Sequence, residues 1–288
     1  MREIASGIFF DSDYDGVNVL AILTDEGVVC IDVPSYPRDA REWVSRVGRL
    51  HRRGLRYLIL TDYHGDRILN SRWLAVPIIC SQPTADRLVT YDKRYPQSLI
   101  ESLSLRNPQL GRELTSGPVD QASVSFTGRM TFHFGRKTIK LNHKPGPNAG
   151  NIWLGWPGSD ILVTGDSIVS VGLPPLGEAL LNPWLDNLES LCSPEYTNTL
   201  FVPGRGEPGG IEVVHHMIDY LKSIRSIVRQ HIEEGRSRQE LSRHTPEVAD
   251  LIVSDDVTPE WTEREISAGL RRVYDQLLTS SSVKVSEN

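Results

Sequence analysis

Apolar and polar positions in the first 60 residues form blocks typical of a sheet covered by a helix. Residues 17–23 and 28–33 are apolar runs separated by an acidic turn that ends at Gly27, a pattern that predicts a β-hairpin. Residues 37–50 carry apolar side chains at helical spacing, which predicts a helix with one face on the sheet. Residues 57–60 form a short apolar run and predict a buried strand. This part of the chain is therefore expected to be α/β.

The rest of the chain continues in the same manner. Further strands are expected at residues 76–80, 123–126, 130–134, 138–141, 152–156, 161–164 and 199–202, and helices at 183–191, 211–234 and within 247–278. Proline and glycine interrupt any period between residues 91 and 120, which indicates either a substrate-facing insertion or a connecting loop with a short helix. We expect one domain over residues 1–236 and a C-terminal helical extension, residues 237–288, packed on it.

Three of the expected strands end in loops that carry ionisable side chains. The heptapeptide Thr61-Asp62-Tyr63-His64-Gly65-Asp66-Arg67 follows the run 57–60, and Gly165-Asp166 and Pro203-Gly204-Arg205-Gly206 follow two later runs. Loops at strand ends are common places for functional groups, and opposite charges brought together there shift one another's proton affinity. A solvated turn is the alternative for the heptapeptide. The recurrence predicts a single site that contains Asp62, His64, Asp66, Arg67, Asp166 and Arg205.

Composition and charge exclude several classes of partner. The chain has 288 residues, 39% of them hydrophobic, and a net charge of -6, so it lacks the clustered basic excess that a nucleic-acid backbone attracts. No apolar run approaches the roughly 18 residues of a membrane span, and we expect a cytoplasmic protein. Cys30, Cys80 and Cys192 are odd in number and lie in apolar segments, which predicts reduced, buried thiols. A homo-oligomer is compatible with the sequence.

The heptapeptide resembles the metal motif of the metallo-β-lactamase superfamily, Thr-His-x-His-x-Asp-His, with two histidines changed. The resemblance covers roughly residues 17–236. It rests also on Thr24-Asp25-Glu26-Gly27, Ile31-Asp32, Thr164-Gly165-Asp166 and Pro203-Gly204-Arg205-Gly206, which follow in the family's order. It implies an αββα four-layer sandwich of two mixed sheets with helices outside, to which the C-terminal helices expected from the residue pattern are added. It also implies metals at the loop edge, and hydrolysis as the commonest activity.

The departures from this motif concern the metal ligands. His64, Asp66 and Asp166 match the family, whereas Asp62, Arg67 and Arg205 stand where the family has histidine. A later histidine of the family falls in Gly146-Pro147-Asn148-Ala149-Gly150, where Pro147 takes its place or the histidine is deleted. The resemblance therefore implies a degenerate metal site.

Two arginines in the second metal position exclude that ion, because a guanidinium has no lone pair to offer and stays charged. We expect Arg67 and Arg205 to pair with Asp66 and Asp166 instead. Asp62, His64 and Asp166 still form a ligand set acceptable for one zinc, manganese or iron ion. We nevertheless expect no tightly bound metal, because nearby guanidinium groups repel a dication. His143 is either a replacement ligand or a side chain that packs at a strand end.

Three hypotheses for the function stay open. In the first, the chain is a hydrolase of altered chemistry, in which Arg67 and Arg205 bind a small anionic ester or amide-type molecule. His64, Asp62 and Asp66 are then its catalytic groups. In the second, it is a non-catalytic relative whose site is closed by salt bridges, and it binds a small anion, a partner protein or nothing. In the third, it is a mononuclear metal hydrolase, whose metal-bound water is the nucleophile.

Overall fold

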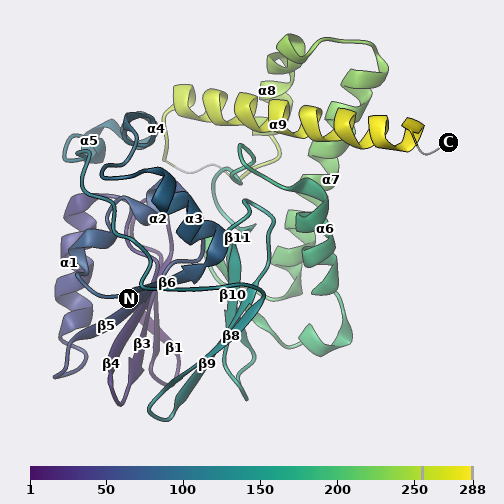
Figure 1. The fold of residues 1–288 in the computed structure, drawn as a ribbon. Helices are drawn as coiled ribbons and strands as arrows, with labels where there is room; N and C mark the ends of the chain where they lie inside the picture. Colours follow the sequence, from purple (N-terminus) through teal and green to yellow (C-terminus); the bar gives the residue numbers. More distant parts are fainter. Residues whose placement is uncertain (254–255, 287–288) are drawn as a thin grey trace.

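The core of the molecule lies between two sheets, and helices cover both outer faces (Figure 1). The computed structural model describes residues 1–253 and 256–286. The first sheet contains, in spatial order, β1 (Arg2–Ala5), β2 (Ile8–Asp11), β3 (Val19–Thr24), β4 (Gly27–Ile31), β5 (Leu55–Ile59), β6 (Ile78–Ser81) and β7 (Val124–Phe126). The second contains β12 (Leu200–Arg205), β11 (Ile161–Val169), β10 (Ile152–Gly155), β9 (Lys137–His143) and β8 (Arg129–Phe134). The expected αββα sandwich is confirmed.

The directions of the strands explain why charged loops gather at one edge. Strands β1 to β4 are antiparallel neighbours, whereas β4 to β7 run parallel to one another. Parallel neighbours need a crossover, and α1 (Pro37–Gly48) provides the one between β4 and β5. In the second sheet β11 and β12 are also parallel. Each of these parallel pairs sends both of its carboxyl ends to the same edge of its sheet.

Strand β11 is longer than the sequence pattern predicts. The apolar run ends at Thr164, but the strand continues to Val169 and pairs there with Arg205 of β12. The register shifts on both sides of Gly165, whose φ of 55° lies in the region that favours glycine. This irregularity lets Asp166 belong to a strand and still reach the site.

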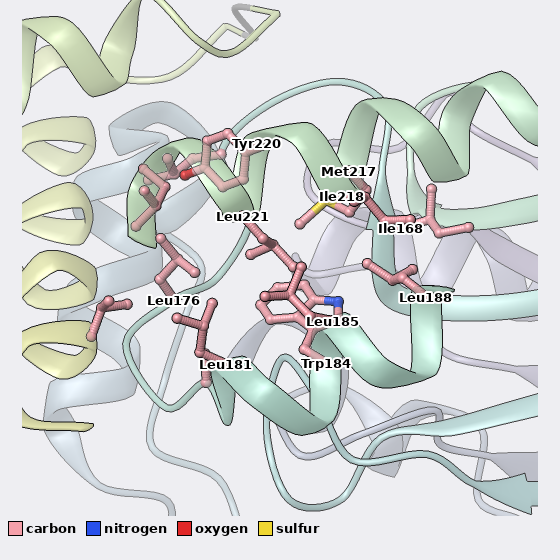
Figure 2. Close-up of a cluster of buried hydrophobic side chains, with 14 of the residues drawn as sticks. Ile168, Leu176, Leu181, Trp184, Leu185, Leu188, Met217, Ile218, Tyr220 and Leu221 are labelled. Carbon is pink, nitrogen blue, oxygen red and sulfur yellow. The ribbon is translucent and has the colours of Figure 1, made fainter. Parts of the chain in front are cut away.

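The outer faces are covered by apolar clusters on the helices. Trp43 of α1 is fully buried against the first sheet, and α3 (Gln82–Thr90) lies on the same side. On the second sheet, α6 (Leu181–Ser190) and α7 (Ile211–Glu233) enclose Trp184, Leu188 and Leu221 (Figure 2). The Trp184 indole nitrogen also donates to the Ser167 carbonyl oxygen at 2.9 Å. This bond ties α6 directly to β11 beside the charged loops.

Residues 91–120 form a packed helical connection. They contain α4 (Gln97–Arg106) and α5 (Pro108–Gly111), and they follow the short α2 (Gly65–Ile68) and η1 (Ser71–Trp73) in the layer above β5. Leu103 is buried, and its carbonyl oxygen accepts a hydrogen bond from the Tyr36 hydroxyl at 3.1 Å. Of the two alternatives for this segment, the structure therefore contains the connection with helices.

The C-terminal helices pack on α7 and on α4. After η2 (Pro194–Tyr196), β12 and α7, the chain forms η3 (Arg238–His244), α8 (Thr245–Ala249) and α9 (Pro259–Ser286). Leu241, Val248 and Leu270 are fully buried in the same cluster as α6 and α7. Figure 1 shows α9 lying across the top of the molecule, from α4 to α7. We propose on this basis that residues 237–288 extend the single domain formed by residues 1–236.

One expectation about the thiols is wrong. Cys30 and Cys80 are buried, as predicted, but Cys192 is exposed. Leu191 at the end of α6 turns inward and is fully buried, so the next side chain along the turn faces solvent.

No helix that the structure describes combines the length and the apolar character needed to span a bilayer.

Candidate active site

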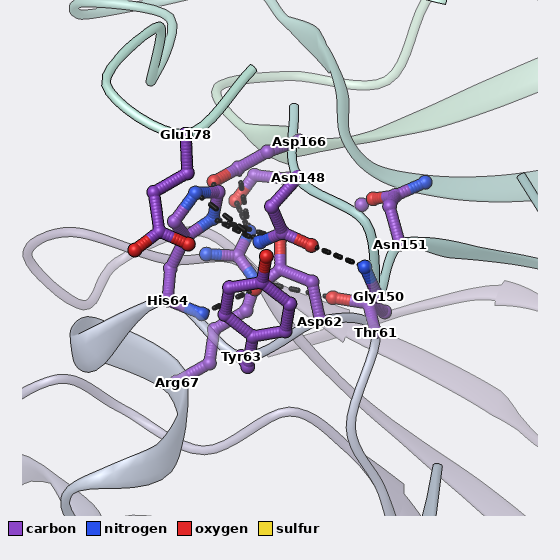
Figure 3. A network of polar contacts seen from close by, with 12 residues as sticks. Thr61, Asp62, Tyr63, His64, Arg67, Asn148, Gly150, Asn151, Asp166 and Glu178 are labelled. Carbon is purple, nitrogen blue, oxygen red and sulfur yellow. Dashed lines mark hydrogen bonds and ion pairs between the residues drawn. The ribbon is translucent and has the colours of Figure 1, made fainter. Parts of the chain in front are cut away.

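Three segments of the chain bring the predicted site residues together, and Figure 3 labels Asp62, His64, Arg67 and Asp166 among them. Asp62 and His64 lie in the loop after β5, and Asp66 and Arg67 are the two middle residues of the short α2. Asp166 comes from β11, and Arg205 is the last residue of β12. All six lie in one connected network of hydrogen bonds and ion pairs. A solvated turn, the alternative for the heptapeptide, is wrong, because Asp62 and Arg67 are fully buried.

Arg67 is the internal cation of this network. Its Nη2 donates to Asp166 Oδ1 at 2.6 Å, and its Nε donates to Thr61 Oγ1 at 3.0 Å. The Nε also lies 3.2 Å from Asp32 Oδ2, and Nη1 lies 3.4 Å from Asp66 Oδ1. Burial alone would lower the pKa of Arg67, but the surrounding carboxylates raise it well above its usual value. The guanidinium therefore stays charged, and each of its three nitrogens faces an acceptor.

Arg205 joins the two carboxylates of the expected second metal position. Its Nη2 donates to Asp66 Oδ2 at 2.5 Å and to Asp166 Oδ2 at 3.1 Å, so the predicted pairing is observed. Burial alone would raise the pKa of Asp166, but Arg205 and Arg67 outweigh burial and hold the pKa of that carboxyl well below its ordinary value. The same two arginines lower the pKa of Asp66 against the effect of burial. Both carboxylates are therefore ionised partners of fixed cations.

His64 is held between Asp62 and Asp166. Its Nδ1 lies 2.9 Å from Asp62 Oδ2 and 3.5 Å from Asp166 Oδ2, while its backbone N–H donates to Asp62 Oδ1 at 2.8 Å. Burial would lower the pKa of His64, but Asp62 and Asp166 outweigh it and raise the pKa to about 10. The ring in this arrangement is an imidazolium near neutral pH. An imidazolium donates hydrogen bonds and does not coordinate metals.

Asn148 is a site residue that the sequence did not predict. Its side chain is fully buried, and its Nδ2 lies 3.3 Å from Nδ1 and 3.2 Å from Nε2 of His64 (Figure 3). Its Oδ1 accepts from the backbone N–H of Gly150 at 2.8 Å. The resemblance to the family motif places Pro147 at the position of the later histidine, or implies that this histidine is deleted. An amide one position further along the same loop is the signal that could have identified Asn148.

His143 does not face the charged network. Its Nε2 lies 2.6 Å from the carbonyl oxygen of Ala149, so the ring closes the loop that carries Asn148. Of the two alternatives for His143, packing at a strand end is the one observed.

We expect replacement of Asn148 by alanine to lower the free energy of unfolding by about 1 kcal/mol, because the buried N–H of Gly150 loses its acceptor. Urea denaturation followed by circular dichroism measures this change. Asn182→Ala, at an exposed position of α6, is the matched control and should leave the midpoint almost unchanged. Equal midpoints for the two variants would show that the Asn148 amide does not hold the loop.

Two cavities meet at Arg205. One of about 280 Å³ is bordered by His64, Asp66 and Arg205, and by residues of α4 and α9. The other, of about 450 Å³, lies on the far side of Arg205 beside the loop between β2 and β3. Arg67 borders neither cavity, and its exposure is 0%. The prediction that Arg67 binds substrate therefore does not fit its position, since its guanidinium reaches neither cavity.

The residues present do not fit a second metal ion. Guanidinium nitrogens lie 2.5 to 3.1 Å from the oxygens of Asp66 and Asp166 that would ligate it. The first metal position keeps a donor set, since ligand atoms of Asp62, His64 and Asp166 all lie within 4.8 Å of one another. Coordination there would require a neutral His64 and an Asp166 released from Arg67 and Arg205. In the arrangement observed, these donors are engaged with one another and with the arginines.

Comparisons with known proteins agree on one family. A family model described as the metallo-beta-lactamase superfamily matches residues 13–230. A curated "Metallo-beta-lactamase type 2" from Bacillus cereus is 25% identical over 220 residues, which cover 74% of this chain and 76% of that protein.

Two solved structures share the fold. A metallo-beta-lactamase from Pontibacter korlensis has a TM-score of 0.60 at 19% identity, over 77% of this chain and 97% of that one. The stereoselective inverting sec-alkylsulfatase Pisa1 from Pseudomonas sp. has a TM-score of 0.68 at 12% identity, over 95% of this chain and 49% of that one. At these identities the two structures establish a common fold. The second also covers most of the C-terminal helices.

Proposed function

Since this chain belongs to the metallo-β-lactamase superfamily, which includes hydrolases, we propose that it is a hydrolase-type protein for a small anionic ester or amide-type molecule. In this proposal Arg67 and Arg205 replace the ligands of the second metal, and no metal is tightly bound. One observation carries it: Arg205 bridges Asp66 and Asp166 while it borders the cavity over His64. A fixed cation that borders a small cavity favours an anionic ligand.

The two arginines have different roles in this proposal. Arg67 balances the buried carboxylates. Arg205, which is 8% exposed, holds the anionic group or the oxyanion that develops during hydrolysis, because preorganised positive charge is most effective in a site with little water. Arg67 does not contact the substrate directly in this proposal, because it does not border the cavity.

His64 is the proposed proton donor, because its ring is charged near neutral pH, and Asp62 orients it. His64 borders the cavity, and Asp62 lies behind it with one oxygen on the ring and the other on the backbone. This double contact fixes the orientation of the ring, as a positioning carboxylate does for a catalytic histidine. Asp66 contacts Arg205 and fixes the position of that guanidinium beside the cavity.

Two alternatives are each favoured by one observation. The pairing of Asp66 and Asp166 with arginines favours a non-catalytic relative that binds a small anion and performs no reaction. The close approach of Asp62, His64 and Asp166 favours a mononuclear metal hydrolase. Both alternatives have the same superfamily fold. They differ from the main proposal only in whether the site binds a metal ion and whether it catalyses a reaction.

Metal analysis and a hydrolase panel separate these alternatives. We expect protein purified without chelator to contain far less than one zinc, iron or manganese ion per chain. The panel contains carboxylic esters, lactones, thioesters, phosphoesters and sulfate esters, the last because of the alkylsulfatase structure. On an accepted substrate, His64→Ala should lower the rate by about 10²-fold or more, and Arg205→Lys should raise KM.

Three results would change the conclusion. One metal ion per chain, with activity that is lost and regained with that ion, would establish the mononuclear hydrolase. Equal background rates for the native protein, His64→Ala and Arg205→Lys would leave the non-catalytic relative. Activity with two bound ions would contradict the role assigned to the arginines.

A further inference from the structure

The first turns of α9 lie over the cavity that contains His64 and Arg205. Trp261, Arg264 and Glu265 border this cavity together with Leu99 and Ser102 of α4. They lie about 200 residues from His64 in the sequence, and no strand-end pattern indicates them. The cavity is therefore built from both the sandwich and the C-terminal helices.

We infer that α9 forms the specificity wall of this cavity and that Trp261, Arg264 and Glu265 select a singly charged anion with an apolar body. This inference rests on the proposed function, because it assumes that Arg205 holds the anionic group. It goes further by assigning the ligand's chemical class and three binding residues.

The wall is held in position by bonds between α9 and α4. The Trp261 indole nitrogen donates to Ser102 Oγ at 3.3 Å, and the Ser102 hydroxyl donates to Glu265 Oε1 at 3.3 Å. Just before α9, the Thr258 hydroxyl donates to the Leu105 carbonyl oxygen at 2.6 Å. The Trp261 ring also lies 5.3 Å from the guanidinium carbon of Arg106. The indole is thus a fixed surface, 9% exposed, which is the kind of preorganised wall that favours binding.

The cavity lining is amphipathic. Arg205 and His64 supply charged groups, and Leu99, Leu103 and Trp261 supply apolar surface. Its volume of about 280 Å³ is below the roughly 300–1,000 Å³ of pockets for drug-sized ligands. A ligand that fits carries one anionic group at Arg205 and a short apolar body against Trp261.

Glu265 limits the number of negative charges in the ligand. Its carboxylate borders the same cavity as Asp66. A second anionic group on the ligand would approach these acids. Arg264 is exposed at the cavity rim, where it attracts the anion before it enters.

Titration of the full-length protein with straight-chain alkanoates tests the inference. Isothermal calorimetry with acetate, butanoate, hexanoate and the dianion hexanedioate compares chain length with charge. We expect affinity to rise by up to about fourfold per added methylene, the value for complete burial, and hexanedioate to bind more weakly than hexanoate. Trp261→Ala should remove the dependence on chain length, and Glu265→Gln should narrow the gap between hexanoate and hexanedioate.

Arg264→Ala and Arg271→Ala are a matched pair on the exposed side of α9, and neither replaces a buried side chain. Arg264→Ala should weaken hexanoate binding several-fold, and Arg271→Ala should not. Binding of all alkanoates with equal affinity, weakened by Arg205→Lys, would overturn the role of α9 but leave the anion site of the proposed function. Failure of every alkanoate to bind, together with no hydrolysis in the ester panel, would overturn both.

Discussion

Replacement of Arg67 by methionine is expected to lower the free energy of unfolding by about 3–5 kcal/mol, the range for a buried ion pair that loses one partner. Methionine keeps much of the side-chain volume but removes the charge that faces Asp166 Oδ1 at 2.6 Å. Asp166, whose exposure is 0%, would then be left with Arg205 as its remaining arginine partner. Urea denaturation followed by circular dichroism gives the free energy directly.

Two further variants test this explanation. Arg53→Met removes an exposed ion pair with Glu26, in which both side chains are about half exposed, and it should change stability by less than about 1 kcal/mol. Asp166→Asn combined with Arg67→Met should lose less than the sum of the single variants, because the removed charges face each other. A loss for Arg67→Met no larger than that for Arg53→Met would show that Arg67 is not the counter-charge of the site.

Replacement of Gly204 by alanine should cost about 3 kcal/mol, the upper part of the range for overpacking a buried site. Gly204 is a buried residue of β12, next in sequence to Arg205. An added Cβ would lie 2.7 Å from the backbone nitrogen of Asp166 and 2.5 Å from Arg67 Nη2, and it would also collide with Asp166 Oδ1. Strand β11 cannot shift to make room without moving Asp166. We therefore expect the variant to weaken both the pairing of β11 with β12 and the ion pairs of Asp166. The melting temperature reports this effect.

Gly48→Ala is the matched control. Gly48 ends α1, it has no positive φ, and an added Cβ there would meet nothing within 4 Å. Alanine at a position with compatible backbone stabilises a protein by about 0.4–1 kcal/mol, so this variant should melt at the same or a higher temperature. If Gly204→Ala melts like Gly48→Ala, the strands around the site are more loosely packed than the contacts indicate.

The fold was predictable because its strands and helices are encoded by local patterns. The hairpin of β3 and β4 and the one-sided apolar spacing of α1 each follow from a short stretch of sequence. The extension of β11 to Val169 was not predictable, because it depends on parallel pairing with β12 and on the backbone freedom of Gly165. Local pattern cannot encode which distant strand a residue will pair with.

The candidate site was predictable in membership but not in geometry. Charged residues after three strands indicated Asp62, Asp166 and Arg205, because strand ends converge at a sheet edge. The inward turn of Asn148 depends on the conformation of its loop, which Gly150 and Leu180 help to set through hydrogen bonds. The contact between α9 and α4 depends on tertiary packing across about 160 residues, for which a single sequence contains no periodic signal.

The cations between Asp66 and Asp166 are part of the polypeptide itself. They are incorporated into the chain during translation. The charge balance of this pocket therefore does not depend on the binding of cations from solution. Such charges cannot dissociate, be exchanged or be scavenged by a competitor. The positive charges of this site are therefore permanent, and only a substitution in the gene changes them.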